Sequence, residues 1–175
     1  MSTLIRPLFA IAVLPFTVTV LVPLWIARSN STSIGLGNSP IAIGVQVAGV
    51  VLLAIGVVLF VSSLRRFATD GKGTLAPWDP PRELVVTGPY SYVRHPMISG
   101  VVITLFAEAM LLRSESQFVW ACVFLALNSI YIPWVEEQDL EIRFGDAYRD
   151  YRINVPVVIP RLRPWRSRRD GPGRR

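Results

Sequence analysis

Two short groups of polar side chains interrupt a largely apolar chain and could carry chemistry. The first is the run Arg94-His95-Pro96, which contains the single histidine of the sequence. The second is the acidic pair Glu136-Glu137, which follows a long apolar segment. Carboxylates at a membrane boundary are costly unless they meet a cation, a hydrogen-bond donor or water. If the two groups meet, the carboxylates can pair with structural cations or bind a cationic ligand, and the residues leave both alternatives open.

The residues around Pro96 restrict the backbone of the first group. Thr87-Gly88-Pro89-Tyr90 predicts a turn in which Gly88 takes a positive φ. Pro96 favours extended backbone at His95 and can occupy the first position of a helix. A helix N-terminus presents unpaired amides and suits an anionic group. The alternative is that Arg94 and His95 only anchor this helix among lipid headgroups.

Four apolar segments could position these groups. Residues 7–27 and 41–64 contain no charge over 21 and 24 residues, and about 20 apolar residues suffice to cross a bilayer. Residues 97–112 and 118–135 are weaker candidates, and the short linker 113–117 favours an antiparallel hairpin. The sequence therefore predicts an all-α, polytopic membrane protein with about four transmembrane helices.

The distribution of charge predicts an orientation. The chain has 51% hydrophobic and 17% charged residues, with a net charge of +6. Of its 18 Lys and Arg residues, all but Arg28 and Arg113 lie before the first span, in the loop 65–97 or after residue 135. Basic residues concentrate in cytoplasmic loops, so we expect a multi-pass protein whose polar groups and C-terminus are cytoplasmic. This uneven distribution argues against a uniformly basic nucleic-acid binder. It does not predict the oligomeric state.

Other common chemistries lack their motifs. A single cysteine, Cys122, and a single histidine provide neither a disulfide framework nor a zinc site, so we expect no metal. The GxG sequence at residues 35–37 follows no predicted strand, which argues against a dinucleotide fingerprint. The sequence also contains no GxSxG motif to present a serine nucleophile.

Several residues inside the apolar segments predict packing. Gly44, Ala48 and Gly56 could let another helix approach closely, and they leave a dimer interface open as an alternative. We expect Glu108 to form an ion pair with Arg113 at the end of its span.

The segment that follows the fourth span predicts a surface helix. Asn128, inside the fourth apolar segment, is expected to form a hydrogen bond between helices. Residues 134–151 carry apolar side chains at helical spacing, which favours a helix lying along the membrane surface. Its apolar face would consist of Leu140, Phe144, Tyr148 and Tyr151. Asp139 and Arg143 are four residues apart and could form an ion pair that supports this helix.

Residues 84 to about 160 resemble a known family. The run Leu84-Val-x-Thr-Gly-x-Tyr-x-x-x-Arg-His-Pro is followed by a predicted hairpin, then by Glu136-Glu-x-x-Leu-x-x-x-Phe-Gly-x-x-Tyr-x-x-Tyr151 and Val155-Pro156. This order resembles the isoprenylcysteine carboxyl methyltransferase and phospholipid methyltransferase superfamily. The resemblance implies an integral membrane methyltransferase that holds S-adenosylmethionine in a cytoplasmic pocket. Its methyl acceptor would be a small lipophilic molecule or a lipid arriving from the bilayer.

The resemblance also implies roles for individual residues. Arg94 and Glu137 would lie around the substrate or behind the cofactor wall. Ile98 stands where the family commonly has tyrosine, and no arginine lies one turn before the acidic pair, where carboxyl methylating members carry one. We therefore expect methyl transfer and leave amine, thiol and other lipid acceptors open. The residues implied to bind the cofactor are Leu84, Val85, Tyr90, His95, Pro96, Met97, Ile98 and Glu136.

These observations divide the chain into three parts. Residues 1–64 form an N-terminal transmembrane pair, 65–160 the catalytic region, and 161–175 a basic, disordered tail. The seven arginines of this tail could bind anionic membrane lipids. Two other functions stay open: an NADPH-dependent membrane reductase, and a non-enzymatic membrane scaffold with a lipid-binding tail.

Overall fold

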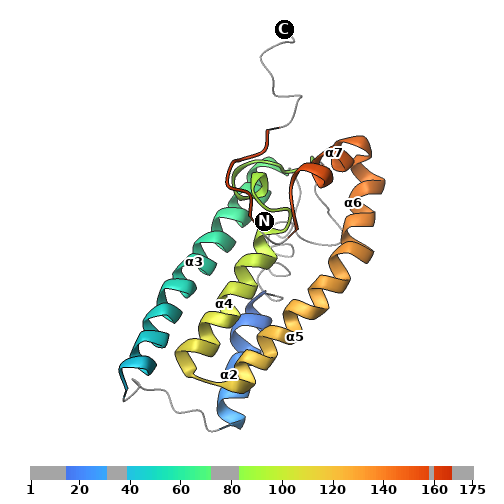
Figure 1. Ribbon diagram of the computed structural model, residues 1–175. Coiled ribbons are helices and arrows are strands. Elements are labelled where there is room, and N and C mark those ends of the chain that lie inside the picture. Colours follow the sequence, from blue (N-terminus) through green and yellow to red (C-terminus); the bar gives the residue numbers. More distant parts are fainter. Residues whose placement is uncertain (1–14, 31–38, 72–82, 158–159, 167–175) are drawn as a thin grey trace, which may run out of the picture.

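The computed structural model describes residues 15–30, 39–71, 83–157 and 160–166, and every regular element within them is a helix (Figure 1). The all-α prediction is therefore confirmed for the described residues. The longer helices run side by side as a bundle, and the loop that precedes α4 lies at one end of it. The α-helices are α2 (Val22–Ser29), α3 (Pro40–Asp70), α4 (Pro96–Leu112), α5 (Glu115–Tyr131), α6 (Glu137–Phe144) and α7 (Asp146–Asn154).

Two helices are long and apolar enough to cross a membrane. One is α3, and the other extends over Glu115–Phe144, in which a π-helical turn joins α5 to α6. Thr17–Ser29 and Pro96–Leu112 are shorter apolar helices. The length criterion thus supports two of the four predicted spans, and the other two stay predictions.

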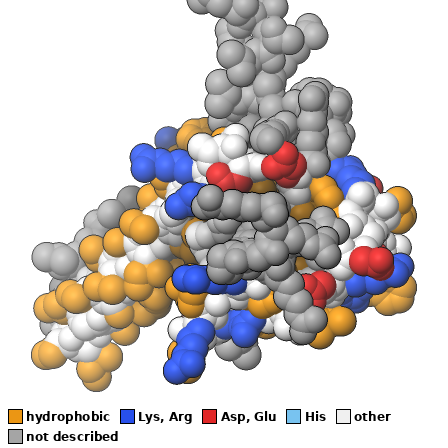
Figure 2. Space-filling model, turned by 90° about the horizontal axis from the view of Figure 1, so that it is seen from above, with side chains coloured by type: hydrophobic (Ala, Val, Ile, Leu, Met, Phe, Trp, Pro, Cys, Tyr) orange, Lys and Arg blue, Asp and Glu red, His pale blue; other side chains and the backbone are white. Residues whose placement is uncertain are grey.

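The outer surface of the bundle is apolar. Figure 2 shows hydrophobic side chains along the flank and charged side chains around the end of the bundle that faces the viewer. Many large apolar side chains of α3 and α5 are exposed, among them Ile41, Val50, Val58, Val119 and Ile130. An exposed apolar surface of this kind suits the hydrocarbon interior of a bilayer, where it contacts lipid chains rather than water.

Small residues bring α3 and α4 into close contact. Gly49, Gly56 and Ser63 are the buried residues of α3 and recur every seven residues. A Cβ atom on Gly56 would lie 2.9 Å from the carbonyl oxygen of Gly100, and a Cβ on Gly100 would lie 2.9 Å from that of Gly56. The two glycines therefore permit backbone contact, as small residues do between membrane helices.

The predicted packing residues Gly44 and Ala48 do not take part in this contact. Both are exposed, and a Cβ on Gly44 would meet nothing within 4 Å. Two α-helical turns take about seven residues, so residues seven apart stay on one helix face. Gly56 shares its face with Gly49. Gly49 lies five residues after Gly44, so Gly44 is on a different face of the helix, and the packing prediction was right for Gly56 alone.

Side chains of α5 hold the segment that begins at the N-terminal π turn, Thr17–Leu21. Gln117 Nε2 donates to the carbonyl of Pro23 at 2.6 Å, and Trp120 Nε1 donates to that of Val18 at 3.2 Å. In this π turn the N–H of Val22 bonds to the carbonyl of Thr17, five residues earlier. The same pattern would pair Val18 with Pro23, which has no N–H. Trp120 supplies the missing donor.

Two polar residues in the apolar helices differ from expectation. In the described part of the chain, Glu108 forms no ion pair with Arg113, and its Oε2 atom is buried without a hydrogen-bond partner. Five residues correspond to about 140° around a helix, so the two side chains leave on different faces. Asn128 does not bond to another helix: its Nδ2 donates to the carbonyl of Phe124, one turn earlier in α5.

The predicted surface helix is two helices. Gly145 has φ 53° and ψ −129°, a conformation that ends α6 and begins α7. Helix α6 continues the direction of α5, and α7 turns back over the end of the bundle (Figure 1). The ion pair of Asp139 with Arg143 is confirmed at 2.6 Å. Two residues of the predicted apolar face, Tyr148 and Tyr151, point inward, because they are only 1% and 2% exposed.

Candidate functional site

The loop before α4, of which residues 83–95 are described, is held at Thr87 by the end of α3. Gly88 has the predicted positive φ, 59°, and opens a short 3₁₀ helix, Gly88–Ser91. The hydroxyl of Thr87 donates to the carboxylate of Asp70, the last residue of α3. Pro96 begins α4, as predicted. His95 precedes it with φ −120° and ψ 61°, which is not the extended backbone that was expected, and its side chain makes no capping hydrogen bond. Local sequence therefore shapes the turn at Gly88 and the start of α4.

The C-terminal region holds the middle of the same loop. The hydroxyl of Tyr151 donates to the carbonyl of Tyr90 at 2.7 Å, and the amide of Arg94 donates to that of Pro156 at 2.9 Å. The amide of Trp165 bonds to Ser91 at 2.9 Å.

The first residues after position 160 therefore belong to this support. We expected a separate, disordered tail from residue 161, but Arg161 also bonds to the loop, through its amide and the carbonyl of Tyr92 at 3.0 Å. Residues 167–175 of the predicted tail lie outside the described residues.

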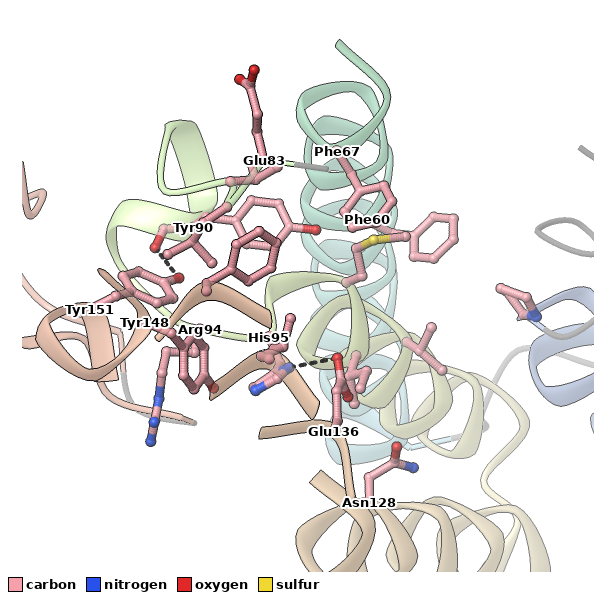
Figure 3. A pocket seen from close by; sticks show the side chains of 18 of the residues that line it. Phe60, Phe67, Glu83, Tyr90, Arg94, His95, Asn128, Glu136, Tyr148 and Tyr151 are labelled. Atoms are coloured by element: carbon pink, nitrogen blue, oxygen red, sulfur yellow. Dashed lines mark hydrogen bonds and ion pairs between the residues drawn. The ribbon is translucent and has the colours of Figure 1, made fainter. Parts of the chain in front are cut away.

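A cavity of about 350 Å³ lies between this loop and the bundle (Figure 3). Its volume falls within the range of small-molecule sites, and its walls are mainly apolar and aromatic with a few polar groups. The loop, α3, α4 and the continuous segment from α5 to α7 all contribute. Eight of the ten residues singled out in the sequence line it: Leu84, Val85, Tyr90, Arg94, His95, Met97, Ile98 and Glu136.

The other two singled-out residues lie behind the wall. Pro96 is buried in the first turn of α4. Glu137 is buried too, with a side chain 2% exposed. Contact with a cofactor therefore stays a prediction for seven of the lining residues, and a place near the substrate stays one for Arg94. The structure gives Pro96 and Glu137 a supporting position.

The two adjacent carboxylates have different surroundings. The Glu136 side chain is 37% exposed at the cavity, with Oε1 3.3 Å from His95 Nδ1. Glu137 lies 3.0 Å from Arg94 Nη1 and 3.2 Å from Arg152 Nε. The acidic pair thus meets Arg94 and His95, an arrangement that the sequence left open. Arg94 and Arg152 give Glu137 the cationic partners that a buried carboxylate needs. Glu136 is the carboxylate that faces the cavity.

A π turn gives the acidic pair this placement. Pro133 lies at the start of the turn Ile132–Glu136, in which the N–H of Glu137 bonds to the carbonyl of Ile132. One extra residue in a turn rotates everything after it by about 100° relative to a continuous α-helix. This π turn sets which face of α6 meets the loop.

The carboxylates also affect the protonation of His95. Its side chain is nearly buried, and burial alone would lower the pKa of the imidazole. The hydrogen bond with Glu136 and the negative charges of Glu136 and Glu137 outweigh burial, so the pKa of His95 is raised above its ordinary value. The polar end of the cavity therefore favours an imidazolium held between two carboxylates.

Sequence reasoning missed the aromatic residues that close the cavity. Phe60 and Phe67 line it from α3, seven residues apart on one face. Residues 140, 144, 148 and 151 also line it, and their helical spacing was noticed but assigned to the membrane surface. Burial raises the pKa of Tyr148 to about 12, so its hydroxyl stays protonated. No sequence signal marked Arg152 as the second cation of Glu137.

In the described ranges, no three His, Cys, Asp or Glu side chains gather in a way that could hold a metal ion. The arrangement instead suits an organic ligand with an apolar or aromatic part and a positive charge, because one carboxylate faces a cavity with apolar walls.

Curated proteins with similar sequences are methyltransferases by name. "Methanethiol S-methyltransferase 2" of Bradyrhizobium diazoefficiens is 34% identical over 73 residues, which cover 42% of this chain and 27% of that protein. "Protein-S-isoprenylcysteine O-methyltransferase" of Schizosaccharomyces pombe is 40% identical over 78 residues, covering 44% and 33%. The matches thus span about a third or less of these relatives. No solved structure is significantly similar to this chain.

The family model for phospholipid methyltransferases matches residues 45–147. This range is more than half of the chain and includes most of α3, the loop, α4, α5 and α6. It therefore contains the His95 and Glu136 side of the cavity. The chain belongs to the phospholipid methyltransferase family.

Proposed function

We propose that this protein is an integral membrane methyltransferase that moves a methyl group from S-adenosylmethionine to a small lipophilic acceptor. The observation that carries the proposal is the Glu136–His95 pair, which faces a mainly apolar cavity lined by loop and helix residues. The family assignment and the names of the relatives support methyl transfer rather than the reductase or scaffold alternatives.

The residues present fit the cofactor. When bound, S-adenosylmethionine supplies an electrophilic methyl group on a positively charged sulfonium. The carboxylate of Glu136 would compensate positive charge, since it is partly exposed at the cavity. Leu84, Val85 and Tyr90 would pack against the adenine ring, because apolar and aromatic walls suit its faces. Met97 and Ile98 would complete this wall from the first turn of α4.

The chain contributes mainly orientation and a dry environment. His95 and Glu136 hold each other in place, and Glu137 is fixed behind them by Arg94. Alignment of two reactants can supply much of the rate enhancement of a bimolecular reaction. We assign no residue as a general base.

We further propose a multi-pass topology with the loop and the C-terminus in the cytoplasm. The support is the segregation of Lys and Arg residues, because only Arg28 and Arg113 fall on the opposite side. This orientation also exposes the cavity to the intracellular compartment in which the cofactor is made.

Calorimetry with S-adenosylhomocysteine on the detergent-solubilised protein tests the cofactor site. We expect Glu136→Gln and His95→Gln each to weaken binding by at least about tenfold, or about 1.4 kcal/mol. Asp139→Asn makes the same carboxylate-to-amide change at an exposed ion pair of α6 and should leave the affinity unchanged. Unchanged affinity in both site variants would refute the site, and a preference of the wild-type protein for NADPH would refute the function.

A further inference from the structure

The cavity connects two hydrophobic clusters at different depths of the molecule. Near the loop, Leu140 and Phe144 pack with Tyr148, Tyr151 and Val155. Inside the bundle, Val18, Phe60 and Phe124 pack against a core that contains Val101, and all four of these residues also line the cavity. The cavity therefore extends from the polar Glu136–His95 pair into an apolar region between the helices, which we call the inner end.

Asn128 is the polar side chain of this inner end. It lines the cavity from α5, two turns before Glu136, and Figure 3 shows it beyond Glu136 on the side away from the loop. Of the described lining residues contributed by α5, the N-terminal π turn and the middle of α3 and α4, it alone has a polar side chain. One polar group among apolar walls is the usual source of orientation in a ligand site.

The hydrogen bond of Asn128 determines which of its atoms faces the cavity. The carbonyl of Phe124 can only accept, so the NH₂ group of the Asn128 side chain must point to it, at 2.8 Å. The carbonyl oxygen Oδ1 is then directed away from that bond. Within the described residues, Oδ1 receives no hydrogen bond from the protein. The inner end consequently offers an acceptor, which suits a ligand group that carries a hydrogen.

The charges of the cavity restrict the ligand further. The cations among the described lining residues are Arg94 and His95, and both are paired with the carboxylates Glu137 and Glu136 at the polar end. A carboxylate ligand at the inner end would thus be buried without a partner and would face the oxygen of Asn128. Burial of an unpaired charge is far more costly than burial of a neutral group.

We propose that the inner end binds the methyl acceptor, and that the acceptor has an apolar body and a neutral reactive group bearing a hydrogen, such as a thiol, hydroxyl or uncharged amine. The body packs against Val18, Phe60 and Phe124, and the reactive group donates a hydrogen bond to Asn128 Oδ1. This assignment rests on the proposed function, because the polar end must then hold the cofactor. It makes Asn128 a residue that determines acceptor specificity.

Fluorine NMR of two matched probes tests this assignment. The probes are 6,6,6-trifluorohexane-1-thiol and 6,6,6-trifluorohexanoate, titrated into protein in lipid nanodiscs saturated with S-adenosylhomocysteine, with empty nanodiscs as the reference for partitioning. We expect the thiol to bind at least about tenfold more tightly than the carboxylate. Equal binding, or tighter binding of the carboxylate, would overturn the proposal.

Variants then separate Asn128 from its surroundings. Asn128→Leu should weaken the thiol about fivefold, the value expected for one neutral hydrogen bond. Ser129→Ala is the matched control: its hydroxyl makes the same kind of bond to the carbonyl four residues earlier, Leu125, on the exposed face of α5. It should not change thiol binding. Val18→Phe narrows the inner end from the facing segment and should weaken the thiol while retaining Asn128.

Calorimetry with S-adenosylhomocysteine on the same variants distinguishes the two proposals. Asn128→Leu and Val18→Phe should bind it as the wild type does, which also shows that they fold. If the wild type binds it and Asn128→Leu does not alter thiol binding, the acceptor site is refuted and the proposed function stands. If the wild type does not bind it at all, the proposed function itself fails.

Discussion

Helices α3 and α4 touch through glycines, whereas the described contacts of α5 combine a buried Ala121 with aromatic rings and side-chain hydrogen bonds. Gly56 and Gly100 bring two backbones together, so close that a Cβ on either would lie 2.9 Å from the opposite carbonyl. On the other side of α4, the rings of Phe106 and Phe118 meet with centroids 5.4 Å apart, and Gln117 reaches the carbonyl of Pro23.

This difference explains where the cavity lies. Small residues let helices pack without voids, and the seam between α3 and α4 has no room for a ligand. The cavity occupies the region between the pair and the α5–α6 segment. The α3–α4 pair therefore acts as a scaffold, and the α5–α6 segment carries Glu136, Glu137 and Asn128 toward it.

The largest effect is expected from a variant that breaks the ion pair between α6 and the loop. Glu137→Gln leaves Arg94 buried without its carboxylate and should lower the free energy of unfolding by about 3–5 kcal/mol, as found when one partner of a buried ion pair is removed. Chemical denaturation of the solubilised protein measures this. Glu136→Gln should cost far less, because that side chain is 37% exposed. Equal losses would contradict the separation of a structural and a cavity-facing carboxylate.

The next largest effect is expected from a variant that disrupts the glycine contact between α3 and α4. In Gly100→Ala the new methyl group would lie 2.9 Å from both Gly56 O and Phe60 N, atoms of a helix backbone that cannot move aside alone. Overpacking of this kind costs about 1–3 kcal/mol, measurable as a lower midpoint of thermal unfolding. Gly44→Ala on α3 is the control, since its methyl group meets nothing within 4 Å. Similar midpoints for the two variants would show that the glycines do not set the helix distance.

A pH titration tests the contact between the loop and the acidic pair. Because the folded protein raises the pKa of His95, its protonation stabilises the fold fully below the unfolded pKa of about 6.5. That stabilisation is lost as the pH rises through the folded pKa. We expect the unfolding midpoint to fall as the pH increases from about 6.5, and His95→Gln to flatten this dependence. A midpoint that rises over the same range would contradict the assigned pairing.

The smallest effect is expected from a variant that removes one side-chain hydrogen bond between α5 and the N-terminal segment. Trp120→Phe retains an aromatic ring and removes the donor to the Val18 carbonyl, which Pro23 leaves without a helical partner. The loss should be about 1 kcal/mol of unfolding free energy, the value of one hydrogen bond. Phe124→Leu changes an aromatic neighbour that donates no hydrogen bond and serves as the reference. If Trp120→Phe has no effect, side-chain hydrogen bonds do not hold α5 in place.

Much of the fold could be predicted because its signals are local. Continuous apolar stretches predict helices. Pro96 suits the first turn of a helix, where its missing N–H is not needed, and Gly88 supplies the positive φ of the turn. That the acidic pair needs a partner was also expected, since a carboxylate next to an apolar span is costly alone, but the sequence did not decide which cations would meet it. Packing faces were harder: Gly44 and Gly56 look alike in the sequence, and only one of them is buried.

The sequence by itself determined the apolar helices, the shaped loop before α4 and the two polar groups at helix ends, because each depends on neighbouring residues and on solvation. Tertiary structure decided the rest. The π turn at Pro133 rotates α6 so that Glu136 faces the cavity and Glu137 faces Arg94, and the break at Gly145 turns Tyr148 and Tyr151 inward. A rotation of about 100° changes which face of a helix is buried without changing its composition, and that choice depends on partners distant in the sequence.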